Sequence, residues 1–436
     1  MDEQEYERDE QTLEARRLKR LEQKRKRKMQ QRIVGGVLLV IVVLVIVLLA
    51  RSCGKKKTAQ TAAAPASSQP ASSEPAVQTT PDTVATLAAV GDIMVYDNQI
   101  ADAKQADGTY NFDDNFKAVS AQTAGADFTV GNLELNFCGA PYSGFPSFKA
   151  PEALAATLKN VGFDLMQTAN TYSIQNGLTG LQSTLQYLDA AGLAHVGTYA
   201  TQADKTKDGG AVLEDVGGIK VAFIAFTKGV NNISVPAGSE YAVNLLYTDY
   251  ATDYSKVDES AILNAVQAAK ALDPDVIVAM LHWGAEYETA ISDTQTKIKD
   301  LLFQNGVDVI LGSHSHLVGP MQEEPVTTVD GEQKTCFVAY SLGNFFSGKE
   351  QAHTAESCVL TLEFTKNGET GDTTISNVSY VPVYLADSGA DASPEFEVLP
   401  IRDAIESGLF PDLQQTMTDA IANLRTNTAS DYDSGK

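Results

Sequence analysis

From Thr83 onward, the sequence alternates between short apolar runs of strand length and longer amphipathic segments of helix length. Alternation of this kind with short links is typical of an α/β domain. Glycines follow three of the helical segments and suit helix ends. The expected strands are 84–90, 128–130, 165–168, 221–226, 276–281 and 307–311, and the expected helices between them are 151–161, 178–191, 257–271 and 293–305.

The last part of the chain has a different pattern. Three apolar segments without helices between them predict antiparallel strands, at 336–341, 357–364 and 378–385. A helix is expected at 403–424, and the polar residues 428–436 predict a disordered tail. The predicted folded domain therefore covers residues 83–427.

Residues 33–50 are eighteen uncharged residues rich in Val, Leu and Ile. That length just spans a hydrocarbon core of about 30 Å, so we expect one transmembrane helix. Eleven Lys and Arg residues precede it and four follow it before Thr58. The positive-inside rule then predicts a cytoplasmic charged tail at 1–32 and an extracellular body on a single-pass membrane anchor. A cleaved signal peptide is the alternative, but the segment before the apolar run is longer than a usual n-region.

Residues 51–82 contain mostly Ala, Ser, Pro, Thr and Gln after a short basic start, which predicts a disordered spacer. The formal net charge of the chain is −23 although its N-terminus is basic. A basic N-terminus before an acidic body indicates membrane topology rather than binding to nucleic acid. The four cysteines are too few and too irregularly spaced for a disulfide scaffold, although one bridge is possible among Cys53, Cys138, Cys336 and Cys358.

Three of the five histidines in the chain follow apolar runs that are predicted to be buried strands. His282 follows the run at 276–281, and His314 and His316 stand in a Gly-Ser-His-Ser-His sequence directly behind 307–311. In an extended chain, residues two apart point to the same side, so we expect both rings to face one site. Neutral imidazole is a common ligand of Zn, Fe and Mn ions. Packing histidines are the alternative, which the cost of unpaired buried polar groups disfavours.

Carboxylates follow the first two predicted strands. Asp92 stands in Gly-Asp-Ile-Met and Glu134 in Gly-Asn-Leu-Glu. Taken alone, Asp92 is as well explained by a turn and Glu134 by an exposed surface position. Together with the three imidazoles, however, the two carboxylates make up the ligand set of a two-metal hydrolase.

In this order and spacing, the motifs resemble the CapA family of bacterial capsule-synthesis proteins, whose members act in poly-γ-glutamate production. That family is itself similar to the calcineurin-type metallophosphatases. The resemblance covers about residues 85–385 and also includes His-Trp-Gly-x-Glu-Tyr at 282–287 and Ser-Leu-Gly-Asn-Phe at 341–345. It implies a four-layer α/β/β/α metallophosphatase-like sandwich, preceded here by the transmembrane helix.

The resemblance also implies roles for individual residues. Glu134 would bridge two divalent ions, of Mn, Fe, Zn or Mg. The implied metal ligands are Asp92, Glu134, His282, His314 and His316. The implied catalytic residues are His282, Glu286 and Asn170, and the implied substrate-binding residues are Lys149 and Asn344, acting on an anionic polymer or another envelope substrate.

The chain departs from the superfamily pattern at three positions. Thr171 and Tyr172 stand where a metal-binding Asn and a catalytic His are expected, and Met94 stands where ordinary phosphatases have a His. A Tyr with an ordinary pKa near 10 is a poor proton shuttle at neutral pH. Two functions therefore remain open: a metal-dependent hydrolase-like protein of envelope polymer synthesis, or a catalytically decayed binding or scaffolding subunit of a polymer synthase complex. A 5′-nucleotidase-like phosphatase is disfavoured by the missing histidine.

Overall fold

The structure is a computed structural model and describes residues 80–435. The predicted cytoplasmic tail, the transmembrane helix at 33–50 and all but the end of the spacer lie outside the described residues. Between residues 80 and 435, no helix combines the length and apolar character needed to cross a membrane. The end of the predicted spacer is placed against the domain, because Asp82 Oδ1 accepts a hydrogen bond from the backbone N–H of Gly368 at 2.9 Å.

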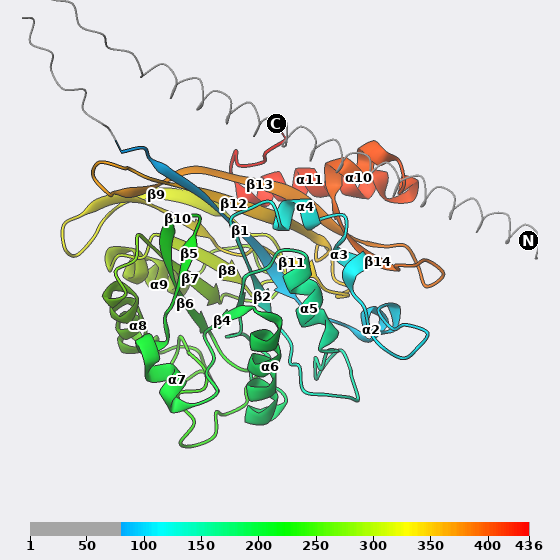
Figure 1. The fold of residues 1–436 in the computed structure, drawn as a ribbon, viewed down its shortest axis with the longest axis horizontal. Helices are drawn as coiled ribbons and strands as arrows, with labels where there is room; N and C mark the ends of the chain where they lie inside the picture. Colours follow the sequence, from blue (N-terminus) through cyan, green and yellow to red (C-terminus); the bar gives the residue numbers. More distant parts are fainter. Residues whose placement is uncertain (1–79, 436) are drawn as a thin grey trace, which may run out of the picture. The chain divides into compact units, whose positions relative to one another are not determined.

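Two mixed β-sheets form the centre of the fold (Figure 1). The larger sheet has the strand order β14-β13-β12-β1-β2-β3-β4, with β11 beside β1. Its strands β1 to β4 run parallel, whereas β12 pairs antiparallel with both β1 and β13. Its strands are β1 (Thr83–Ile93), β2 (Phe128–Leu133), β3 (Leu165–Gln167), β4 (Ala194–Val196), β11 (Asn344–Phe346), β12 (Glu356–Lys366), β13 (Thr373–Asp387) and β14 (Phe396–Pro400).

The smaller sheet has the strand order β5-β6-β7-β8-β10-β9. Its four central strands run parallel, and the two edge strands are antiparallel to their neighbours. Its strands are β5 (Val212–Val216), β6 (Ile219–Thr227), β7 (Val276–His282), β8 (Val309–Ser313), β9 (Met321–Thr327) and β10 (Gln333–Ala339).

Alternation along β6 shows how the layers pack. Phe223 faces the larger sheet, where its ring stacks on Phe128 with centroids 5.6 Å apart. Its neighbour Ile224 points to the opposite face and shares a hydrophobic cluster with Ile262 and Leu302. Because side chains alternate across a strand, one half of the apolar residues joins the two sheets and the other half lies under helices.

Helices cover the outer faces of the sheets (Figure 1). The helices α8 (Glu259–Ala271) and α9 (Asp293–Gln304) pack on the smaller sheet, and α10 (Ile401–Ser407) and α11 (Gln414–Thr428) pack on β12 to β14. The remaining helices are α2 (Asp97–Asp102), α3 (Asp113–Phe116), α4 (Ser120–Thr123), α5 (Ala153–Asn160), α6 (Gly177–Ala191), α7 (Gln202–Thr206), η1 (Lys207–Gly210) and η2 (Pro411–Leu413). The predicted α/β class is therefore confirmed.

Two details of the prediction are wrong, and the pairing predicted for 336–341 is only partly confirmed. The helix expected at 403–424 is two helices, because Gly408 ends α10 in a left-handed conformation. The segment expected as an antiparallel strand at 336–341 is β10, which runs parallel to β8 and antiparallel to β9. The tail from residue 428 is not disordered where the structure describes it, since the buried Asp433 carboxylate accepts hydrogen bonds from Arg402 and Arg425.

Candidate metal centre

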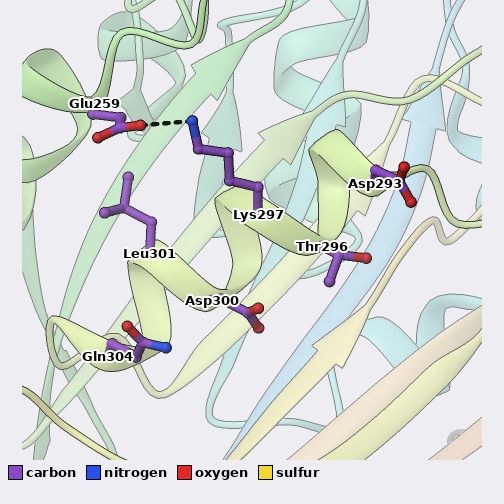
Figure 2. Close-up of a pocket in the computed structure, with 7 residues that line it drawn as sticks. All are labelled: Glu259, Asp293, Thr296, Lys297, Asp300, Leu301 and Gln304. Carbon is purple, nitrogen blue, oxygen red and sulfur yellow. Dashed lines mark ion pairs between the residues drawn. The ribbon is translucent and has the colours of Figure 1, made fainter.

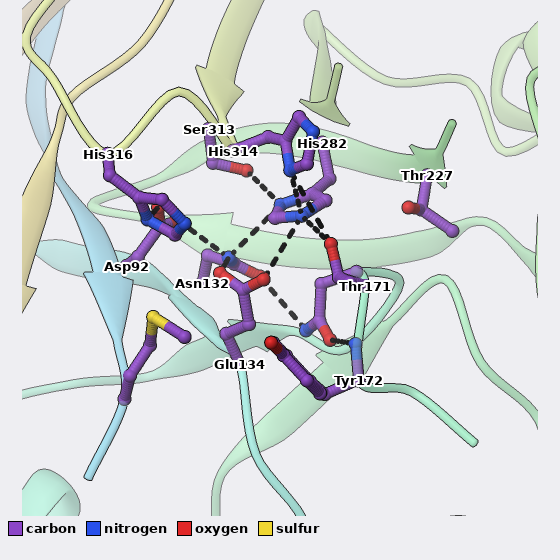
Figure 3. Close-up of polar contacts among 12 residues, drawn as sticks. Asp92, Asn132, Glu134, Thr171, Tyr172, Thr227, His282, Ser313, His314 and His316 are labelled. Atoms are coloured by element: carbon purple, nitrogen blue, oxygen red, sulfur yellow. Dashed lines mark hydrogen bonds and ion pairs between the residues drawn. The ribbon is translucent and has the colours of Figure 1, made fainter. Parts of the chain in front are cut away.

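The carboxyl ends of four strands bring all five predicted metal ligands together (Figure 3). Asp92 lies near the end of β1, Glu134 directly follows β2, and His282 ends β7. The remaining two, His314 and His316, follow β8. Parallel strands present their carboxyl ends at the same edge of a sheet, and here the facing edges of two sheets meet. All five side chains are buried.

The five residues form two groups. Glu134, His282 and His314 make up one group, and Asp92, Glu134 and His316 make up the other. In each group the possible ligand atoms all lie within 4.8 Å of one another. Three protein ligands with further open positions are typical of a catalytic metal site. Glu134 belongs to both groups, which is the arrangement that a carboxylate shared by two ions needs.

The polar atoms of the first group fit a divalent cation. Glu134 Oε1 is buried and has no hydrogen-bond partner in the described chain, although His282 Nε2 lies 3.2 Å from it. His314 Nδ1 lies 3.0 Å from the same His282 nitrogen. One imidazole can donate a hydrogen bond to the other, but Glu134 Oε1 then still has no hydrogen-bond donor. A bound cation would satisfy this costly buried acceptor.

Neighbouring polar groups orient the candidate ligands. Ser313 Oγ lies 3.0 Å from His282 Nδ1, which leaves Nε2 directed at Glu134. Asn132 Nδ2 donates a hydrogen bond to Asp92 Oδ1 at 2.7 Å. Supporting contacts of this kind are typical of metal-binding histidines and carboxylates. Ser313 and Asn132 were not predicted as site residues, although Asn132 lies in the same motif as Glu134.

Close approach of backbones requires glycine in front of the histidine segment. A Cβ atom on Gly312 would lie 2.0 Å from the carbonyl oxygen of Tyr340. The strand β8 then ends at Ser313, and His314 and His316 have left-handed φ values of 95° and 61°. Such φ values are rare for residues other than glycine and occur often at functional sites. The prediction that strand alternation orients both rings is therefore wrong, because a bend brings them together, with ring centroids 6.3 Å apart.

The two histidines have opposite pKa shifts. Burial, and next the charge of His282, lowers the pKa of His314 well below its ordinary value. Burial alone would also lower the pKa of His316, but its hydrogen bond to Asp92 and the charges of Asp92 and Glu134 raise it to about 9. In the metal-free protein His314 is therefore neutral and His316 is an imidazolium paired with Asp92.

These two shifts together contribute most to the stability of the metal-free protein near pH 6.5. Below that pH the unfolded chain takes up a proton at His314 that the folded chain does not, so stability falls as the pH decreases. The stabilisation from His316 is complete below its unfolded pKa of about 6.5 and is lost as the pH rises through about 9. Thermal unfolding midpoints in the presence of a chelator measure both slopes. A His316→Gln variant should lose the alkaline slope, and an identical slope in that variant would contradict the assignment.

Asn170 has a positioning role rather than contact with the ligand groups. Its Nδ2 donates hydrogen bonds to Asn132 Oδ1 at 3.1 Å and to the Leu133 carbonyl at 2.7 Å. Its Oδ1 accepts from the backbone N–H of Tyr172 at 3.1 Å. Asn170 therefore ties its own loop to the segment that carries Glu134.

The other predicted site residues lie at different distances from the centre. Asn344 Oδ1 lies 2.9 Å from His316 Nδ1, so Asn344 touches a candidate ligand. Glu286 is exposed, and its charge adds to the rise in the pKa of Tyr172, which is due first to burial and then to Glu134. Lys149 is half-buried and lies near enough to Cys138 to lower the pKa of its thiol, which burial raises. Its substrate-binding role stays a prediction. The thiols of Cys138, Cys336 and Cys358 are free.

Thr171 and Tyr172, where the chain departs from the superfamily pattern, both face the centre. Thr171 Oγ1 lies 2.9 Å from His282 Nε2 and 3.4 Å from His314 Nδ1. The Tyr172 ring packs edge-on against Phe148 with centroids 4.5 Å apart. Figure 3 shows the Tyr172 hydroxyl pointing toward the side where Glu134 lies. Both substitutions therefore change the lining of the centre itself.

A separate surface hollow of about 490 Å³ lies along α9 (Figure 2). Four charged residues line it, and its lysine is already paired, since Lys297 Nζ lies 2.7 Å from Glu259 Oε1 with both side chains well exposed. It contains none of the candidate ligands. The hollow therefore offers no alternative to the centre at the strand ends.

Solved structures with a similar fold are distant from this chain. One is the 5′-nucleotidase precursor from Thermus thermophilus, with a TM-score of 0.40 and 16% identity, covering 79% of this chain and 58% of that one. Another is the calcineurin-like phosphoesterase YfkN from Bacillus subtilis, with a TM-score of 0.38 and 14% identity, covering 79% of this chain and 100% of that one.

Two curated relatives match most of the folded domain. The PGA biosynthesis protein CapA of Bacillus subtilis (strain 168) is 24% identical over 305 residues, which are 67% of this chain and 71% of the relative. The capsule biosynthesis protein CapA of Bacillus anthracis is 25% identical over 294 residues, which are 65% of this chain and 64% of the relative. A family model described as "Bacterial capsule synthesis protein PGA_cap" matches residues 86–349. That range contains all five candidate ligands.

Proposed function

This chain belongs to the family of bacterial capsule synthesis proteins, and we propose that it acts in the biosynthesis of a poly-γ-glutamate capsule or another cell-envelope polymer through a divalent metal centre. The activity we propose is hydrolase-like, on an anionic polymer or another envelope substrate. The observation that carries the proposal is the pair of ligand groups that share Glu134, a buried carboxylate with one oxygen that accepts no hydrogen bond from residues 80–435.

In such a centre, some residues would bind the metal ions and others would hold these ligands in position. Asp92, Glu134, His282, His314 and His316 would hold two divalent ions, which would polarise an oxygen of the substrate. Asn132, Ser313 and Asn170 would keep the ligands in place through the hydrogen bonds that they make. Glu286, which is exposed and whose charge acts on Tyr172, would be the group that exchanges protons with solvent.

The metal content of the purified full chain tests this proposal. We expect about two Mn, Fe, Zn or Mg ions per chain after dialysis, because each group offers three ligands. A full chain that retains no divalent ion would contradict the metal-dependent function and favour the alternative function.

The alternative is a catalytically decayed subunit that binds or scaffolds a polymer synthase complex. One observation favours it: Tyr172 replaces the expected proton-transferring histidine. Burial, and next the charge of Glu134, raises the pKa of its hydroxyl far above neutral pH. A hydroxyl that stays protonated cannot act as a general base. In this case polymer production would require the protein but not its metal.

We also propose that residues 33–50 anchor the protein in the cell membrane, with residues 1–32 cytoplasmic and the folded domain extracellular. The proposal rests on the apolar length of the segment and on the excess of Lys and Arg before it. An extracellular domain would meet a polymer at the cell surface.

Protease treatment of intact protoplasts is expected to degrade the folded domain and to leave residues 1–32 intact. Antibodies against each segment measure the two outcomes. In permeabilised protoplasts, both segments should be degraded, which shows that the tail is cleavable when accessible. If the folded domain survives in intact protoplasts but not in permeabilised ones, the domain is cytoplasmic and the proposed topology is wrong.

A further inference from the structure

Two buried polar atoms beside His316 have no hydrogen-bond partner within residues 80–435: Tyr287 Oη and Asn344 Nδ2. Asn344 directs its Oδ1 toward His316 Nδ1 at 2.9 Å, which leaves its Nδ2 as a free donor. The Tyr287 ring lies against the His316 ring with centroids 5.8 Å apart. Because buried donors without partners are costly, the occurrence of two of them in residues that contact one candidate ligand indicates a missing acceptor.

A positive charge lies over the ring of Tyr287, one of the two donors. Lys349 is half-buried, and its Nζ lies 5.2 Å from the centroid of the Tyr287 ring. The segment that carries Lys349 is fixed by Gln99, whose Oε1 accepts hydrogen bonds from the backbone N–H groups of Gly348 at 2.8 Å and Tyr96 at 3.0 Å. A hydroxyl, an amide and an ammonium group are all donors, and such a set suits an anion with several oxygens.

A second lysine near the centre is already in use. Lys228 Nζ donates a hydrogen bond to the Gly284 carbonyl at 2.6 Å and lies 4.8 Å from the centroid of the Tyr254 ring. Lys349 also contacts an aromatic ring, but that ring belongs to Tyr287, whose hydroxyl has no hydrogen-bond partner within residues 80–435. The anion-binding features therefore gather on the side of the Asp92, Glu134 and His316 group.

We propose that Tyr287 Oη, Asn344 Nδ2 and Lys349 Nζ form an oxyanion subsite that holds a carboxylate or phosphoryl group of the substrate beside this group. The inference rests on the proposed function, because the subsite would orient the same substrate that the metal centre acts on. Tyr287 gives the sharpest test of the subsite, because its hydroxyl makes no hydrogen bond with any residue between 80 and 435.

Calorimetric titration of the full chain, loaded with Mn²⁺, tests the subsite with two probes: inorganic phosphate and the dipeptide γ-glutamylglutamate. Tyr287→Phe removes the hydroxyl but keeps the ring on His316, and Lys349→Gln removes the charge. We expect each variant to weaken binding of at least one probe about tenfold, as the loss of a hydrogen bond to a charged group does. Tyr187→Phe is the matched control, because Tyr187 is exposed on α6. The probe that responds identifies the group as phosphoryl or carboxylate.

Metal content is measured in the same samples. Equal affinity of Tyr287→Phe and the parent for both probes would overturn the subsite, and so would a metal-loaded parent that binds neither. Loss of metal from Tyr287→Phe would also overturn it, since the hydroxyl would then support the ligands. If the parent retains no metal yet binds a probe in a Tyr287-dependent way, the metal proposal fails and the subsite stands.

Discussion

We expect that replacing His314 and His316 together by alanine removes the divalent metal from the chain. His314 belongs to one ligand group and His316 to the other, so each group would keep only two of its three protein ligands. Loss of an outer contact alone typically costs 10- to 100-fold in metal affinity, so loss of a ligand from each group should cost more than about 100-fold. Metal analysis after dialysis would then find less than one ion per chain.

The chain contains a matched control for this experiment. Its other two histidines are His195, which lies 3.2 Å from Asp189, and His353, which lies 2.8 Å from Glu356. Both have carboxylate neighbours, yet neither belongs to a candidate ligand group. Replacing both by alanine should leave the metal content unchanged. Equal metal in the His314→Ala, His316→Ala variant and in the parent, with both proteins folded by circular dichroism, would show that the centre does not bind metal.

The meeting of the five ligands could be predicted from the sequence because it depends on a general property of sheets. Each ligand closely follows an apolar run, and parallel strands end at a common edge. The orientation of His314 and His316 could not be predicted in the same way. It depends on the contact of Gly312 with the Tyr340 backbone and on the bend that follows, which only the packing of β8 beside β10 determines.

Features that depend on contacts between residues far apart in the sequence could not be predicted either. Asp433 is ordered by two arginines on separate helices, Arg402 and Arg425, so the polar tail is not disordered despite its composition. The influence of Lys149 on the pKa of Cys138 depends on a loop packing that the sequence does not show, whereas its substrate-binding role stays a prediction. Tyr287 lies in the His-Trp-Gly-x-Glu-Tyr motif, but only the folded structure shows that its hydroxyl has no hydrogen-bond partner among residues 80–435.

The double replacement Thr171→Asn, Tyr172→His should raise the hydrolysis of a generic phosphate ester well above that of the parent. Thr171 Oγ1 already lies 2.9 Å from His282 Nε2, so an amide oxygen at this position would reach the space between the candidate ligands. The ordinary pKa of histidine lies near the working pH, whereas the Tyr172 hydroxyl, whose pKa burial raises, stays protonated. A positioned acid or base contributes roughly 10²–10⁴-fold, so we expect a gain of at least about tenfold.

The rate of p-nitrophenyl phosphate and bis-p-nitrophenyl phosphate hydrolysis by the metal-loaded full chain measures this gain. Asp92→Ala in the same background should cancel it, because Asp92 belongs to the Asp92, Glu134 and His316 group and contacts His316 at 3.1 Å. Tyr172→Phe is the matched control: it keeps the packing on Phe148 and should give no gain. A double variant that is folded and metal-loaded but no more active than the parent would mean that Tyr172 is not the replacement of a lost acid–base group. The inherited phosphatase mechanism would then be excluded, and the centre would have to serve other chemistry or binding.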